Sequence, residues 1–571
     1  MNNFKKDKLT VIDFFCGAGG FSEGFRQHGF EILLGVDCWQ PAIDTINHNF
    51  SKEFIKKNIL DFSESIEEIE MLPDSDIIIG SPPCISFSSS NKSGKADKSL
   101  GVLLIETFLR IIAIKKYQSN SKLKAWFMEN IVNSSKFLKP SYTFQDLKLS
   151  GWAKKNKINP NKIAITLFGN SQIVNSADYG SFQARKRIIS GEIIKYGKLI
   201  LPKPINKSFD VKNNLPFHKT ISVIKENFPS PFERSSNELI KDPLYNFEIE
   251  KNKITDHFYD TGIYKSDWSN SKYLKTNHPY MGKMSFPENL NKPSRTITAT
   301  NIATSRESII YKTEIKRKGH GEFRSPTVRE AAIIMGFPIT YQFLGSENTK
   351  WRLVGNAVCP PLSRAIAELV KKKINPNSDL SFFITKTPNL NGVINLNNFS
   401  INKFIKAPIK NKGSKFRRHP FKNGNMTIAL SNYNINDNKS RDKWFVTAFY
   451  GTGEGFRIRT YRENFYKQIE PIIINNFRDG NDFVHLINNG FTKKIANKNL
   501  MQEMFEKQKS INGFLEPTIL IDKVSTIIEK FDKNKESFTQ NGFNIFEKTI
   551  IPKRQLYALY VINKIISITN K

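Results

Sequence analysis

The sequence predicts an α/β fold built on a largely parallel sheet. Near-continuous apolar runs at residues 9–15, 31–36, 76–79 and 125–128 are typical of strands that helices cover on both faces. A glycine-rich turn at residues 16–20 follows the first run, and glycines at such a turn let the backbone pass close to a ligand. Ligands of open α/β sheets bind at the carboxyl ends of the strands, so we expect the functional residues there.

The second strand ends in Asp37, an acid placed like those that bind both hydroxyls of a ribose. Trp39 offers an aromatic surface nearby that can cover an adenine. The glycine spacing is not GxGxxG, and no basic residue follows the turn as a phosphate-binding loop requires. A cofactor with one nucleoside and no pyrophosphate therefore fits this half of the sheet better than NAD or ATP.

The third apolar run leads into Gly80-Ser81-Pro82-Pro83-Cys84, which puts a cysteine at the rim of the sheet. The two prolines remove backbone donors and restrict φ, so the thiol is positioned before a substrate arrives. The alternative is a turn that happens to contain a cysteine. The polar residues 89–99 that follow are either a lid over a phosphate backbone or a solvated loop.

Two more strands carry charged residues toward the same rim. Glu129 follows the fourth apolar run, where it can act as a proton donor or can be a capping or surface acid. Arg185 and Arg187 flank Lys186, and residues i and i+2 of a strand share a face. Two guanidiniums aimed together would grip a phosphate or a base edge, and the alternative is a basic surface turn.

The composition indicates the kind of partner and the cellular compartment that suit the chain. The 571 residues carry a formal net charge of +33, which favours an anionic partner, nucleic acid before membrane. Because Lys, Asn and Ile are abundant throughout the chain, the net charge alone is weak evidence for such a partner. The four cysteines lack CxxC spacing, so we expect neither disulfides nor a metal site, and a reducing cytoplasm suits them. We expect neither a signal peptide nor a membrane span.

In order along the chain, several stretches resemble the motifs of the DNA cytosine-5 methyltransferases, which use S-adenosylmethionine. These stretches are DFFCGAGGF (13–21), Asp37, GSPPCISFS (80–88), MENI (128–131), QARKR (183–187), PSRTIT (293–298), TVREAAIIMGFP (327–338) and VGNAVCPPL (354–362).

The resemblance implies a Rossmann-like methyltransferase sheet with an inserted target-recognition region and an extra C-terminal α+β domain. The implied segments are residues 1–199 for the first part of the catalytic core, 200–292 for target recognition, 293–374 for the return segment of the core and 375–571 for an accessory domain of unknown role. Residues 375–398 are rich in Asn and Pro and indicate a linker. Residues 403–422 mix cations with Phe404, Phe416 and Phe421, as a nucleic-acid surface or a solvated loop would.

By this resemblance Cys84 is the nucleophile that adds to C6 of cytosine and turns C5 into an enamine carbon. Glu129 would hold the ring near N3 and the amino group. Arg185, with Arg187 behind it, would hold the extruded nucleotide. The ring face is hidden in a duplex, so the cytosine must be flipped out, and the loop 86–99 would close behind it.

The resemblance also assigns the cofactor contacts. They are Phe15, Gly17, Ala18 and Gly20 for the methionine part, Asp37 for the ribose, Pro83 beside the methyl path, Leu103 against the adenine, and Asn356, Ala357 and Val358 for closing the site.

Three positions depart from the family pattern. Asn58, followed by Ile59, stands where an acid commonly receives the adenine amino group, and its amide oxygen could accept instead. Ile85 replaces the usual glutamine after the nucleophile. Cys38 occupies the place where an aromatic residue often follows the ribose acid, and Trp39 either substitutes for that ring or does not.

We therefore predict a site-specific DNA (cytosine-5-)-methyltransferase that protects host DNA in a bacterial restriction-modification system. The alternatives are a methyltransferase fused to a restriction-type nuclease in the last third of the chain, and a tRNA cytosine-5 methyltransferase. The expected partners are double-stranded DNA and a cognate restriction endonuclease, with no membrane. The expected form is a monomer in the cytoplasm, at the nucleoid.

Overall fold

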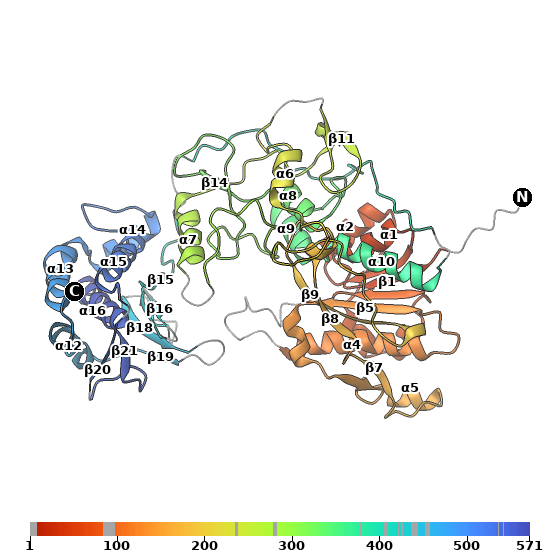
Figure 1. Cartoon of the computed structure of the whole chain (residues 1–571), viewed down its shortest axis with the longest axis horizontal. Coiled ribbons are helices and arrows are strands. Elements are labelled where there is room, and N and C mark those ends of the chain that lie inside the picture. Colours follow the sequence, from red (N-terminus) through yellow and green to blue (C-terminus); the bar gives the residue numbers. More distant parts are fainter. Residues whose placement is uncertain are drawn as a thin grey trace, which may run out of the picture. The chain divides into compact units, whose positions relative to one another are not determined.

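The chain forms two compact units. Figure 1 shows their helices and strands, coloured by position in the sequence. The first unit contains Met1–Ile263 and Phe286–Lys403, and the second contains Tyr264–Ser285 and Phe404–Lys571. The computed structural model describes residues 8–83, 98–233, 238–277, 282–376, 379–404, 409–420, 422–423, 426–435, 443–451, 457–534, 536–540 and 542–571.

A seven-stranded sheet with the order β3-β2-β1-β4-β5-β9-β8 organises the first unit. The strands β1 to β5 run parallel, whereas β9 runs antiparallel to both β5 and β8. The predicted α/β fold and the four predicted strands are confirmed. The strands are β1 (Thr10–Phe14), β2 (Glu31–Asp37), β3 (Ile55–Lys56), β4 (Ile77–Gly80), β5 (Ala125–Asn130), β8 (Ser171–Asn175) and β9 (Lys186–Ile193).

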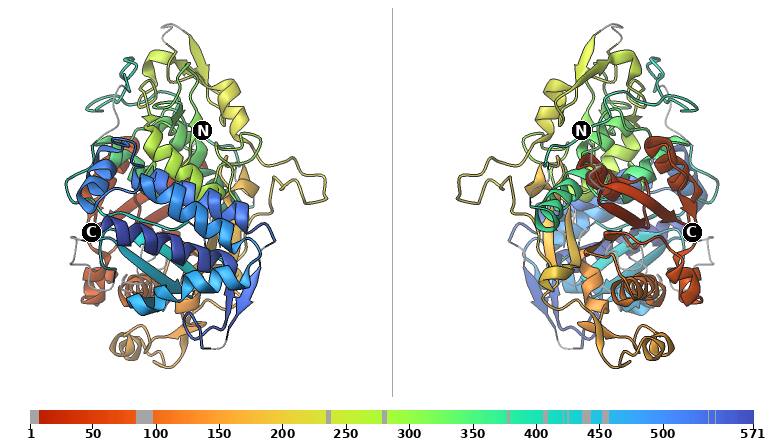
Figure 2. Two further views of the ribbon diagram at one scale, coloured as in Figure 1. Left: turned by 90° about the vertical axis from the view of Figure 1, so that its left-hand side faces the viewer. Right: turned by 90° about the vertical axis from the view of Figure 1, so that its right-hand side faces the viewer.

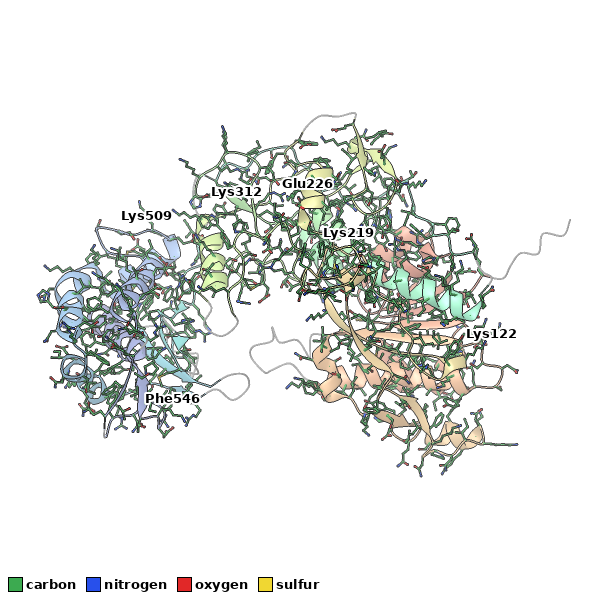
Figure 3. All side chains as sticks on the ribbon, in the orientation of Figure 1. Lys122, Lys219, Glu226, Lys312, Lys509 and Phe546 are labelled. Atoms are coloured by element: carbon green, nitrogen blue, oxygen red, sulfur yellow. The ribbon has the colours of Figure 1, made fainter. Side chains whose placement is uncertain are left out.

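Helices cover both faces of this sheet, as the continuous apolar runs require (Figure 1). Val11 and Ile77 belong to the apolar core under one set of helices, whereas Ile12 and Ile78 belong to a second core under α4. Side chains fill the space between the layers (Figure 3). The covering helices are α1 (Gly20–Gln27), α2 (Gln40–Phe50) and α10 (Pro360–Ile374) on one face and α4 (Lys98–Tyr117) on the other.

Two glycines of α1 allow the end of the domain to return against its beginning. A Cβ on Gly20 would lie 2.2 Å from the carbonyl oxygen of Val358, and one on Gly24 would lie 2.3 Å from the amide nitrogen of Arg364. A side chain at either position would push α1 away from the segment that contains Val358 and the start of α10. This close packing explains how residues more than 300 positions apart share one region of the fold.

The interval between β9 and α10 is built mostly from loops, short strands and short helices. Its core includes Ile254 and Phe258, and its polar interior contains Arg324, whose guanidinium donates to the carboxylates of Glu314 and Glu330. The elements are α6 (Ile221–Asn227), β10 (Leu239–Lys241), β11 (Glu248–Glu250), β12 (Gly262–Ile263), β13 (Tyr311–Lys312), β14 (Phe323–Arg324), α8 (Val328–Met335) and α9 (Glu347–Asn356).

Residues 379–403 run along the first unit, so the expected linker at 375–398 is corrected. The amide nitrogen of Phe383 donates to the carbonyl of Gln27 at 2.7 Å. Asn397 accepts from the backbone of His257 and Phe258 and donates to Ile254. The asparagine side chains of this segment form hydrogen bonds with nearby backbone groups. An Asn-rich composition, which is also typical of flexible linkers, therefore belongs here to a segment that packs on the first unit.

The second unit is an antiparallel sheet with helices packed on one face, and it has its own apolar core. Its helices lie side by side, in blue, in the left view of Figure 2. The last helix, α16, contacts β17 and β18. The elements include α7 (Lys265–Thr276), β15 (Arg417–Arg418), β16 (Lys422–Asn423), β17 (Met426–Ser431), β18 (Phe445–Tyr450), β19 (Arg457–Arg459), α12 (Ile469–Asn476), α13 (Gly480–Leu486), α14 (Lys498–Lys507), α15 (Pro517–Phe531) and α16 (Lys553–Thr569).

The aromatic residues at the start of this unit serve its packing. Phe416 is buried in the core, and the ring of Phe404 lies 5.1 Å from that of Tyr264. Phe421 lies outside the described residues. Within the part of the chain that the structure describes, no helix combines the length and apolarity that crossing a membrane needs.

Candidate active site

A cavity of about 540 Å³ lies where the carboxyl ends of β1, β2, β4 and β5 meet. Segments far apart in the sequence contribute to its lining, including the glycine turn, the start of β9 and the end of α9. The predicted site residues that line it are Phe15, Gly17, Ala18, Asp37, Pro83, Glu129, Arg185, Arg187, Asn356 and Ala357.

The predicted nucleophile Cys84 lies outside the described residues, as do Ile85 and residues 86–97 of the predicted closing loop. The segment that leads to Cys84 is fixed at the cavity. Ser81 Oγ donates to the carbonyl of Phe15 at 3.0 Å, and Asn130 Nδ2 donates to the carbonyl of Pro82 at 3.2 Å. Gly80 lets β4 pass α4, because a Cβ there would lie 2.5 Å from the ring of Phe108.

Asp37 is held by backbone donors on both sides. Its Oδ2 accepts from the amide of Gly17 at 3.0 Å, and its Oδ1 accepts from the amide of Trp39 at 2.8 Å. Burial raises the pKa of Asp37, while these backbone donors and the charge of Arg352 oppose that rise. The carboxylate thus links the glycine turn to the N-terminus of α2.

Asp13 lies behind the glycine turn and was not predicted as a site residue. It is fully buried, and its Oδ2 accepts from Ser22 Oγ at 2.6 Å. Burial raises the pKa of Asp13 to about 7, and the nearby charge of Asp37 adds to the rise. The burial and the raised pKa of Asp13 could not be predicted from its place in an apolar strand, because both depend on the residues that the fold packs around it.

Glu129 and Arg187 form an ion pair across neighbouring strands. Arg187 Nε lies 2.9 Å from Glu129 Oε1, and each side chain is only 10% exposed. The antiparallel pairing of β5 with β9 places the two residues near one another, since Glu129 faces Ile189 in the register. The pair puts one negative and one positive group in the wall of the cavity.

Arg185 ties together three segments of the first unit. Its Nη1 donates to the carbonyl of Ile297 and its Nη2 to the carbonyl of Gly355, each at 3.1 Å. The side chain is buried and also lines the cavity. Its guanidinium therefore fixes the segment before α8 and the end of α9 beside β9.

The end of α9 approaches the segment around Thr298 closely. A Cβ on Gly355 would lie 2.3 Å from the carbonyl oxygen of Thr298, and Trp351 Nε1 donates to that same oxygen at 3.0 Å. This packing presents Asn356 and Ala357 to the cavity. Val358 lies behind them, against Gly20.

Five predicted cofactor residues lie outside the cavity lining: Gly20, Asn58, Ile59, Leu103 and Val358. Asn58 is exposed and caps the 3-10 helix Ile59–Ser63, with its Oδ1 accepting from the amide of Leu60 at 3.1 Å. Ile59 is buried in the apolar core. Leu103 is half-buried on α4, where its carbonyl accepts from Thr107.

Sequence reasoning missed Arg352, which lines the cavity beside Trp39. Its guanidinium carbon lies 4.4 Å from the centre of the Trp39 ring. No local pattern identifies Arg352, because its relation to Trp39 exists only after α9 has packed beside α2.

Comparison with known proteins identifies a family that covers most of the first unit. The profile of the family described as C-5 cytosine-specific DNA methylase matches residues 9–372, so residues 373–571 lie outside it. Type II methyltransferase M1.HphI of Haemophilus parahaemolyticus is 28% identical over 377 residues, covering 64% of this chain and 87% of that protein. Type II methyltransferase M.FnuDI of Fusobacterium nucleatum is 23% identical over 387 residues, covering 64% of this chain and 95% of that protein. The solved structure of the Entamoeba histolytica methyltransferase EhMeth is 18% identical, covers 65% of this chain and all of its own, and superposes with a TM-score of 0.39.

Proposed function

Because the chain belongs to the C-5 cytosine-specific DNA methylase family, we propose that it methylates C5 of a flipped-out cytosine in duplex DNA through a covalent adduct with Cys84. We further propose that it is the modification enzyme of a type II restriction-modification system, as the names of its relatives suggest. The observation that carries the proposal is one cavity that unites the glycine turn, Asp37, the Pro-Pro segment and the Glu129–Arg187 pair.

The cavity suits S-adenosylmethionine, the methyl donor that this family uses. Its volume of about 540 Å³ lies within the range of small-ligand sites. A Cβ on Gly17 would meet no protein atom closer than 4.0 Å, so open space lies beside the turn. Each oxygen of Asp37 accepts one backbone hydrogen bond and keeps capacity for a ribose hydroxyl.

The residues that would hold this cofactor follow from the lining. Phe15, Gly17 and Ala18 would hold its methionine part, Asp37 its ribose, and Asn356 and Ala357 would close over it. When bound, S-adenosylmethionine supplies an electrophilic methyl group. The backbone around the glycine turn would orient the cofactor, and Pro83, which lines the cavity, directly precedes Cys84 in the sequence.

The proposed chemistry begins with the thiolate of Cys84 forming a bond to C6 of cytosine, which makes C5 nucleophilic. C5 would then form a bond to the methyl carbon as the bond from that carbon to the sulfonium sulfur breaks, so that S-adenosylhomocysteine leaves with the electron pair on sulfur. C5 then loses its proton to a base. The electron pair of that C–H bond re-forms the C5–C6 double bond, and the bond from Cys84 to C6 breaks. Cysteine suits both the addition and the elimination step, since a thiolate adds to C6 near neutral pH and is also a good leaving group.

Glu129 would meet the polar edge of the cytosine, where charge changes as the thiolate adds. Arg187 fixes the direction of that carboxylate through the 2.9 Å ion pair. Arg185 holds two backbone segments of the cavity wall together, so it also maintains the shape of the pocket. A cytosine could reach these groups only after leaving the base stack, because its ring faces are covered in a duplex.

Bisulfite sequencing of DNA from cells that carry the gene tests this proposal. We expect protected cytosines within one recurrent sequence, and none in matched cells that carry the Cys84→Ser gene. Unmodified DNA in both strains, with the protein present in soluble form, would contradict the proposed activity. Methylation confined to tRNA would favour the tRNA alternative.

A further inference from the structure

Arg352 and Trp39 form a stacked wall at the end of the cavity that holds Asp37. Trp39 precedes α2, and Arg352 comes from α9. The guanidinium carbon lies 4.4 Å from the centre of the indole, and both residues line the cavity. The same turn that fixes Asp37 also fixes the indole, because the amide of Trp39 donates to Asp37 Oδ1.

The positions expected to contact the adenine do not supply a comparable surface here. Position 38 is a cysteine, so it offers a thiol in place of a ring. Asn58 is exposed and caps its own short helix, and Leu103 does not line the cavity. A purine beside Asp37 therefore needs another flat partner.

The geometry points to the Arg352–Trp39 stack as the surface that binds the adenine end of the cofactor. This inference rests on the proposed use of S-adenosylmethionine and assigns a binding role to two residues of that site. A guanidinium over an indole is a favourable cation–π arrangement, and both groups stack well on a purine. The adenine would pack against the pair while its ribose bonds to Asp37.

The position of Arg352 also joins the two ends of the catalytic core. Arg352 and Asn356 are four residues apart on α9, so they share one face of that helix. Trp39 and Asp37 belong to the first part of the core. A ligand held between them would therefore bridge the two segments, and the positive charge of Arg352 lies close enough to favour the ionised form of Asp37.

The test is isothermal titration of the full-length protein with S-adenosylhomocysteine and with 5′-methylthioadenosine, which lacks the amino-acid part. We expect Arg352→Met and Trp39→Ala each to weaken both ligands by about tenfold. Trp39→Phe keeps a ring and should lose only about twofold. The double variant should lose less than the product of the single losses, since either change disrupts the same stack.

Arg364→Met is the matched control. Arg364 also lies over aromatic rings, 5.4 Å from Tyr245 and 4.9 Å from Phe382, but it does not line the cavity. It should bind both ligands as the wild type does. Wild-type affinity in Arg352→Met and Trp39→Ala, or an equal loss in Arg364→Met, would overturn the assignment. A wild-type protein that binds neither ligand would instead contradict the proposed cofactor.

Discussion

Arg187 Nε lies 2.9 Å from Glu129 Oε1, and only 10% of either side chain is exposed. The two residues come from antiparallel neighbours, β9 and β5, and both face the cavity. An ion pair with so little access to water is costly to break from one side, because the remaining charge stays buried without compensation. The same contact therefore serves both the stability of the fold and the orientation of the proposed catalytic acid.

Arg187→Met should lower the free energy of unfolding by about 3 kcal/mol and abolish methylation, since Glu129 would be left as an unpaired buried charge. Glu129→Gln/Arg187→Met removes both charges and should regain part of that stability without regaining activity. Urea unfolding and a methyl-transfer assay measure the two effects. A double variant no more stable than Arg187→Met would argue against a coupled pair.

Cys84→Ser should remove methyl transfer entirely and prevent the trapped covalent complex with DNA that contains 5-fluorocytosine. The reason is that a serine hydroxyl is far weaker than a thiolate as a nucleophile at neutral pH. Denaturing gel electrophoresis detects the complex. Cys38→Ser is the control, because Cys38 is an exposed thiol in the lining of the same cavity and should keep the adduct. Turnover by Cys84→Ser would eliminate the proposed nucleophile.

Much of the first unit could be predicted from the sequence because its strands are continuous apolar runs with functional residues at their ends. This pattern placed Asp37, Glu129 and Arg187 at one edge, and the structure brings all three into one cavity. The Arg352–Trp39 contact could not be predicted, because it joins residues 313 positions apart through the packing of α9.

The second unit was harder to predict for a similar reason. Tyr264–Ser285 leaves the middle of the sequence to join the second unit, and nothing in its composition indicates this. One contact is local to that unit: Tyr273 donates its hydroxyl to the carbonyl of His419. Phe416 suggested an exposed stacking ring among cations, yet it is a core residue. The pattern of cations and aromatics did not distinguish packing from binding.

Gly20→Ala should weaken S-adenosylhomocysteine binding and lower stability by about 1–3 kcal/mol, because the added Cβ would lie 2.2 Å from the carbonyl of Val358. The return segment with Asn356 and Ala357 would have to move. Gly151→Ala is the control, since a Cβ there meets no atom within 4 Å and lies in a helix that alanine favours. Calorimetric binding and urea midpoints compare the two. Equal behaviour would mean that α1 can shift without disturbing the cavity.

Asp13→Asn should change how stability depends on pH. Burial raises the pKa of Asp13 to about 7, from an ordinary value of 3.8, so the folded chain keeps a proton that the unfolded chain loses first. The stabilisation from this proton is complete below pH 3.8 and is lost as the pH rises toward 7, by at most about 1.4 kcal/mol per pH unit. Asparagine cannot ionise, so the variant should gain stability relative to the wild type between pH 4 and 7.

Urea midpoints of the two proteins at pH 5, 6, 7 and 8 measure this difference, which should grow up to pH 7 and then level off. Asp146→Asn is the control, because the hydrogen bonds from Lys139 and Thr143 lower the pKa of Asp146 to about 2, below the tested range. Its stability should differ from the wild type by a constant amount across these four pH values. Parallel curves for Asp13→Asn and the wild type would show that Asp13 ionises equally in both states, and would remove burial as the cause of a raised pKa.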